Sequence, residues 1–227
     1  MKLYFLVEGI SSEMQVYPEW VKLYLPNLEI HDDFDSFKCS DSGVYYISGE
    51  GYPSILNHIE HSVSDIKLSA DVDYFFIVLD SDEDSIEARE EEVKVKLEML
   101  ELPERVNVCI VVQKRCFETI LLGNRYVIPR QPNTEPLVSY MRYYNVNDDD
   151  PELMGAYNDG DTHSQFHAKY AIKALKERRV RYSKSNCSGV ANLQYFEKVV
   201  ERVDKDQHLK SLSPLINTLT EVREKLS

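Results

Sequence analysis

The chain has 227 residues, of which 43% are hydrophobic and 11% aromatic, so it can bury a sizeable core and is not disordered as a whole. With 39 acidic and 26 basic residues its formal net charge is −13, which argues against a protein that coats phosphate backbones with its whole surface. The charge does not exclude a nuclease, because a metal site itself needs carboxylates and a basic surface can be local.

The four cysteines are far apart and include no CxxC pair. This spacing predicts reduced thiols, no zinc framework and a cytoplasmic location. No apolar run approaches the length that spans a bilayer, so we expect no membrane partner.

In the first half of the chain, apolar strand-like runs alternate with helical patterns. The expected strands are Lys2–Val7, Val44–Ser48, Tyr74–Leu79 and Val106–Val112. The expected helices begin at Ser12, Pro53 and Ser85. In the first of these helices Gln15 would complete a capping box with Ser12, and Pro26 would end the helix. The strands are continuously apolar, which is typical of strands buried on both faces. The pattern predicts an α/β fold with a parallel sheet flanked by helices over residues 1–113.

The second half, residues 114–227, predicts a mostly helical C-terminal extension. A short helix is expected at Cys116–Gly123, followed by long proline-containing loops over 124–165. Helical periodicity returns in Phe166–Glu177, Asn192–Val203 and Pro214–Leu226.

Carboxylates follow the ends of the expected strands. Glu8 follows the first strand, and Asp80, Asp82 and Asp84 follow the third. The carboxyl ends of parallel strands converge on one crevice and adjacent strands lie about 4.8 Å apart, so these side chains can meet at one ion. A hard cation such as Mg²⁺ takes oxygen ligands and would neutralise them. The alternative is structural, because acids that precede a helix cap it and match its dipole; Glu13 can be read in that way too.

The order of these motifs resembles a TOPRIM domain, the Rossmann-like Mg²⁺-binding fold shared by topoisomerases, primases, recombination mediators and a group of small nucleases. The resemblance covers residues 1–113. It implies that Glu8 is a general acid/base or a bridging metal ligand. The residues that carry the resemblance are Val7-Glu8-Gly9 with Glu13, then Gly49 and Gly51, then Asp80, Asp82 and Asp84. The metal ligands that the resemblance implies are Glu8, Glu13, Asp80, Asp82 and Asp84.

Among TOPRIM proteins, the chain looks most like the overcoming-lysogenization-defect (OLD-like) nucleases of bacterial antiviral defence and mobile elements. A topoisomerase needs large additional domains, and a bacterial primase carries a zinc module. The OLD-like branch places a further acid and a lysine after the fourth strand, which implies a metal role for Glu118 and a catalytic role for Lys184. A solvated helix acid and a surface lysine are the structural alternatives. No GxxxxGK[ST] motif occurs, so an ATPase partner would be a separate chain.

A basic segment in the second half predicts a nucleic-acid-binding stripe beside two tyrosines, Tyr170 and Tyr182, that would stack on bases. The alternative is a solvated helix that balances the acidic remainder. His163 and His167 lie four residues apart, but a pair without a third ligand favours surface or core positions over a metal site. The stripe consists of Lys169, Lys173, Lys176, Arg178, Arg179 and Arg181.

These features together predict a nuclease that hydrolyses phosphodiester bonds of nucleic acid, DNA above all, with two Mg²⁺ or Mn²⁺ ions. Two alternatives stay open. One is a non-hydrolytic regulatory module that binds Mg²⁺ and nucleic acid and acts with a partner. The other is a phosphotransferase on a small substrate, which would need an enclosed pocket. The sequence indicates no oligomeric state.

Overall fold

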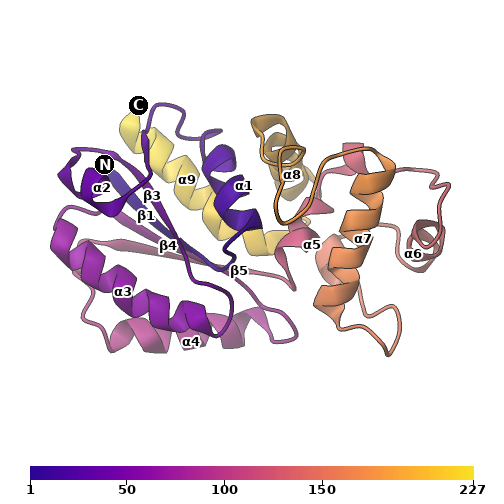
Figure 1. The fold of residues 1–227 in the computed structure, drawn as a ribbon, viewed down its shortest axis with the longest axis horizontal. Helices are drawn as coiled ribbons and strands as arrows, with labels where there is room; N and C mark the ends of the chain where they lie inside the picture. The colour runs from indigo at the N-terminus through magenta and orange to yellow at the C-terminus, as the bar shows by residue number, and fades with distance from the viewer.

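The computed structural model describes residues 1–227 and contains one five-stranded, all-parallel sheet with the strand order β2-β3-β1-β4-β5 (Figure 1). The strands are β1 (Lys2–Val7), β2 (Ile30–His31), β3 (Gly43–Ser48), β4 (Tyr74–Asp80) and β5 (Asn107–Gln113). The predicted α/β class with a parallel sheet is confirmed. Because β1 is central and its two neighbours come later in the chain, the crevice expected of such sheets lies at its carboxyl end.

Helices cover both faces of the sheet and continue beyond it. They are α1 (Ser12–Val21), α2 (Phe34–Cys39), α3 (Ser54–Ser69), α4 (Ile86–Glu98), α5 (Phe117–Leu121), α6 (Leu137–Tyr143), α7 (His163–Glu177), α8 (Leu193–Asp206) and α9 (Ser213–Leu226), with 3₁₀ turns η1 (Arg125–Val127), η2 (Pro151–Leu153) and η3 (Lys210–Leu212). None of the helices combines the length and the apolar character needed to cross a bilayer. The sequence patterns missed β2, α2 and α6, which are all short.

The alternation of side chains along β1 divides the core into two layers. Leu3, Phe5 and Val7 face a cluster that includes residues of α1, α8 and α9. Tyr4 and Leu6 face the opposite cluster, which α3 and α4 cover. Figure 1 shows α1 and α9 on one side of the sheet and α3 and α4 on the other.

The second half of the chain shares the core of the first half. Leu219 of α9 belongs to the same buried cluster as Phe5 of β1. The Trp20 ring of α1 stacks on Phe196 of α8, with ring centroids 4.7 Å apart, and its indole N–H donates to the carbonyl of Val190 at 2.8 Å. The extension thus supplies a helix of the sheet layer and, around α6 and α7, a further apolar cluster of its own.

The expected capping box at Ser12 and Gln15 is wrong. Ser12 is the first helical residue, and the residue before it, Ser11, has helical backbone angles and makes no side-chain cap. A side-chain cap needs an extended backbone at that position. Gln15 instead donates to the carbonyl oxygens of Ser11 at 2.9 Å and Lys184 at 3.0 Å. The helix also ends at Val21, well before the expected stop at Pro26.

Glu152 in η2 gives the extension a dependence on pH. The side chain is 9% exposed and accepts the backbone N–H of Ser211 at 3.1 Å, and burial raises its pKa from 4.5 to about 7. The folded chain therefore holds a proton that the unfolded chain releases above its own pKa. The free energy of unfolding should accordingly fall by about 2–3 kcal/mol as the pH rises from about 4.5 to about 7.

We expect Glu152→Gln to lose this pH dependence, and the exposed substitution Glu104→Gln to keep it. Urea unfolding at about pH 5 and about pH 7.5 measures the difference for each variant. Equal pH slopes in the wild type and Glu152→Gln would contradict the assignment.

Candidate active site

The site is built where β1 and β4 end side by side. Val7 is paired with Val78 in the sheet, so the next residues of the two motifs leave the sheet together. The backbone N–H of Asp80 donates to Oε2 of Glu8 at 2.9 Å, and the backbone N–H of Glu8 donates to the carbonyl of Val78, also at 2.9 Å. The structure thus joins the two motifs that the sequence places 72 residues apart.

A pocket of about 210 Å³ lies at this end of the sheet. The β1–α1 loop, the start of α1, the end of β4, α5 and the loop after α7 line it. Its ionisable side chains are Glu13, Asp80, Glu118 and Lys184. Four of the residues predicted for the site therefore meet in one pocket, although they come from four separate segments.

Glu13 reaches the pocket because Gly9 has no side chain. A Cβ atom at Gly9 would overlap the Glu13 carboxylate. The carboxylate lies against the backbone of the loop after β1 and is buried, with 8% of the residue exposed. The glycine of the Val7-Glu8-Gly9 motif therefore makes room for the acid four residues later.

Asp80 is held by two donors from the next segment of the chain. Its Oδ1 accepts from Nε2 of Gln113 at 3.0 Å, and its Oδ2 accepts from the backbone N–H of Phe117 at 3.2 Å. Gln113 is itself fixed, because its Oε1 accepts from the Tyr17 hydroxyl at 2.8 Å. This chain of contacts orients the carboxylate, and the sequence patterns did not single out Gln113 or Tyr17.

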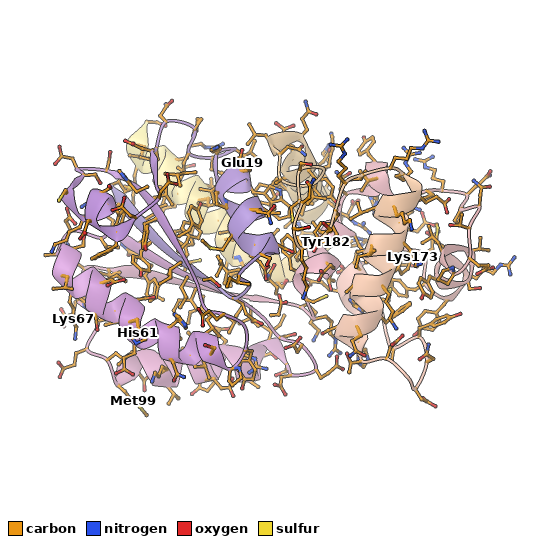
Figure 2. The ribbon with its side chains drawn as sticks, in the orientation of Figure 1. Glu19, His61, Lys67, Met99, Lys173 and Tyr182 are labelled. Atoms are coloured by element: carbon orange, nitrogen blue, oxygen red, sulfur yellow. The ribbon has the colours of Figure 1, made fainter.

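Tyr182 holds Glu118. The Tyr182 hydroxyl donates to Oε1 of Glu118 at 2.7 Å, and Figure 2 labels Tyr182 close to α5. The prediction that Tyr170 offers a stacking surface is wrong, whereas that for Tyr182, which is partly exposed, stays a prediction. Tyr182 is engaged in the site, and Tyr170 is fully buried, with its hydroxyl donating to the carbonyl of Tyr144 at 2.9 Å.

Burial and mutual repulsion act on the acids of the site. Burial and then the negative charges of Glu8, Glu13 and Glu118 raise the pKa of Asp80 well above its usual value. Burial raises the pKa of Glu13 to about 7 and also raises the pKa of Glu8. A cation bound among these groups would favour their charged forms.

The acids fit a hard divalent cation by donor type and charge. All are oxygen donors, which Mg²⁺ prefers, and Glu13, Asp80 and Glu118 line the pocket. Their arrangement in this structure does not form such a site, because no group of three or more His, Cys, Asp or Glu side chains is placed to hold a metal ion. Protein N–H and O–H groups meet the carboxylates of Glu8, Asp80 and Glu118 instead.

Asp82 and Asp84 do not line the pocket. The Asp84 carboxylate is 62% exposed and forms an ion pair with Nη2 of Arg89 at 2.6 Å. Arg89 is buried in α4, also pairs with Glu92 at 2.8 Å, and lies over the Tyr52 ring at 3.5 Å. Sequence reasoning missed Arg89, because it is one cation within a highly charged helix.

The two histidines of α7 have structural partners, as the sequence reading favoured. The buried His167 ring contacts the Thr119 hydroxyl through Nδ1 and the Met154 carbonyl through Nε2, both at 2.9 Å. His163 contacts Glu83 at 2.6 Å. The Glu83 contact attaches the start of α7 to the loop after β4, beside the site.

The six cations of the predicted stripe are all exposed, but they do not form one uniform surface. Lys169 pairs with Asp161 at 2.5 Å, and Arg178 donates to the carbonyl of Tyr126 at 3.2 Å. Lys173 and Lys176 form no ion pair. Figure 2 labels Lys173 on α7, apart from Tyr182.

No family model, curated protein or solved structure matches this chain. The TOPRIM resemblance accordingly rests on the motifs of the sequence.

Without a divalent cation, Glu13→Gln should raise the melting temperature by roughly 2–4 °C at about pH 8, because it removes a buried negative charge from among other acids. Thermal unfolding with a chelator measures this. The matched control is Glu19→Gln near the far end of the same helix, where the half-buried Glu19 pairs with Lys22 (Figure 2). A melting temperature of Glu13→Gln at or below that of the wild type would contradict the repulsion.

Proposed function

We propose that the protein is a Mg²⁺-dependent nuclease that hydrolyses phosphodiester bonds of nucleic acid, with DNA as the expected substrate and Mn²⁺ as an alternative cation. The observation that most supports this proposal is the pocket shared by Glu13, Asp80, Glu118 and Lys184. Glu118 and Lys184 lie outside the TOPRIM motifs, and only the OLD-like resemblance pointed to them.

The size of the pocket favours a large substrate. Pockets that enclose a drug-sized molecule have volumes of about 300–1,000 Å³. The pocket beside Asp80 has about 210 Å³, which suits metal ions and one phosphate group while the rest of the substrate stays outside. This argues for nucleic acid over the small-molecule phosphotransferase.

In the proposed reaction a water oxygen bonds to phosphorus, the bond from phosphorus to one sugar oxygen breaks, and that oxygen takes up a proton. Bound Mg²⁺ would supply Lewis-acid stabilisation of the phosphate oxygens at Glu13, Asp80 and Glu118. Glu8, beside the backbone of Asp80, is proposed to accept the proton of the water. Lys184 is proposed to offset the negative charge that develops on the phosphate.

Asp82 and Asp84 could bind a metal ion only if the loop after β4 rearranged. Because Asp84 is paired with Arg89, its ligation of a metal would require that ion pair to open. Asp82 adopts a positive φ of 49° just after the strand. We therefore propose Glu8, Glu13, Asp80 and Glu118 as the principal acids, with Asp82 and Asp84 as ligands of a rearranged site.

The proposed cellular setting rests on the cysteines and on the OLD-like resemblance. All four cysteines are free, which agrees with the reducing cytoplasm. The OLD-like resemblance suggests a role in antiviral defence or on mobile DNA, with a separate ATPase chain as partner.

The test of the nuclease is cleavage of supercoiled plasmid, single-stranded DNA and RNA with Mg²⁺, with Mn²⁺ and with a chelator. We expect cleavage only with the cations. Asp80→Asn should lower the rate at least about 100-fold because it removes a ligand charge, and Lys184→Ala about as much. Glu19→Gln should cleave like the wild type.

Cleavage that survives both substitutions would refute the assigned centre. A protein that binds DNA and Mg²⁺ but cuts none of the three substrates would instead be the non-hydrolytic module. That second result would support the assigned metal site and would refute the proposed hydrolysis.

The stripe is tested by the salt dependence of DNA binding, measured in the Asp80→Asn background to prevent cleavage. Lys173→Ala should weaken binding to every DNA sequence and lower the slope of log K against log salt by about 1, because one phosphate contact is lost. Lys67→Ala on α3, far from α7 in Figure 2, should leave the slope unchanged. Equal slopes in the two variants would remove Lys173 from the interface.

A further inference from the structure

A second pocket, of about 550 Å³, lies between η1, the end of α7 and α8. None of its lining residues lines the pocket beside Asp80. Its character is basic on a chain whose net charge is −13. The ionisable residues around it are Arg125, Arg130, Arg178, Lys198, Arg202 and Lys205, with Glu201 and Asp206 as the acids.

Other cations already neutralise the two acids. Glu201 pairs with Lys198 at 2.8 Å and with Lys205 at 2.5 Å. Asp206 pairs with Arg125 at 2.6 Å. The remaining three cations, all arginines, have no acidic partner. These are Arg130, Arg178 and Arg202.

Arg202 carries its charge in the interior. It is 2% exposed, and its guanidinium donates to the carbonyl oxygens of Leu122 at 3.1 Å, Val146 at 2.8 Å and Asp149 at 2.7 Å. These contacts satisfy its hydrogen bonds and join the pocket walls, but they supply no negative charge. Asp150 and Asp206 lie near enough to favour the charged form of Arg202, so Arg202 joins the pocket walls and leaves Arg130 and Arg178 to meet an anion.

An aromatic ring lies beside these cations. Tyr126 of η1 is 67% exposed, with Nζ of Lys198 5.1 Å from its ring centre. Its backbone carbonyl accepts from Nη2 of Arg178 at 3.2 Å, which places that guanidinium beside it. Exposed aromatic rings next to cations are the surfaces on which nucleic-acid bases stack.

We propose that this pocket binds a phosphate group carried next to a base, as in a nucleotide or at the end of a nucleic-acid strand. Arg130 and Arg178 contact the phosphate oxygens, for which the planar guanidinium fork is suited. Tyr126 stacks on the base. The volume lies within the range of small-ligand sites. The proposal does not depend on nuclease activity.

The test is calorimetric titration of the full chain in a chelator, so that no divalent cation bridges a ligand to the acids. The probes are inorganic phosphate, ATP, and one oligonucleotide with and without a 5′-phosphate. Arg130→Gln and Arg178→Gln should each weaken binding of the phosphorylated probes about tenfold, the effect of losing one charge-assisted contact. Arg105→Gln, an exposed arginine before β5, is the matched control and should change nothing.

One further variant separates the contribution of the arginine charge from that of its planar shape, and a second separates recognition of the base from recognition of the phosphate. Arg130→Lys keeps the charge without the fork and should fall between the wild type and Arg130→Gln. Tyr126→Ala should weaken ATP and the oligonucleotide while leaving inorganic phosphate unchanged. Preference for ATP or for the 5′-phosphorylated strand identifies the source of the phosphate. Absence of binding by every phosphorylated probe, or arginine variants that behave like Arg105→Gln, would overturn the proposal.

Discussion

The candidate site depends on the pairing of β1 with β4, because this pairing sets Glu8 against the backbone of Asp80. Acids gathered in a buried place repel one another and favour protonation, as the raised pKa values of Asp80 and Glu13 show. The fold offsets part of this cost with donors from the backbone and from neutral side chains, among them the amide of Gln113. Each donor orients one carboxylate without supplying a positive charge, so the repulsion among the acids is only partly offset.

The second half of the chain completes this pocket as well as the core. Gln15 of α1 donates to the carbonyl of Lys184, and the carboxylate of Glu83 accepts the backbone N–H of Ser164 at the start of α7. These contacts attach the loop after α7 to α1 and the start of α7 to the loop after β4. Residues 1–113 alone would lack Glu118 and Lys184, and the sheet would lack α9. The sheet provides the first acids, and the extension closes the site around them.

The sequence predicts the sheet well, because its strands are continuous apolar runs, which are typical of a parallel sheet covered on both faces. It misses β2, which has two residues and therefore no periodicity to detect. Tyr170 was misread as a surface residue, although its spacing from Phe166 and Ala174 places all three on the buried face of α7. The basic pocket was invisible in the sequence, because its lining residues are spread from Gly123 to Asp206 and only the tertiary fold brings them together.

The two pockets lie at the two ends of one short segment. Arg178 lines the basic pocket and Lys184 lines the acidic one, and six residues of chain span at most about 22 Å. The basic segment that the sequence suggested as a single stripe therefore connects two sites of opposite charge. In the proposed nuclease, this segment would lead a phosphate backbone from the cations of the basic pocket toward the acidic one, where a bound metal ion would make the carboxylates compatible with phosphate.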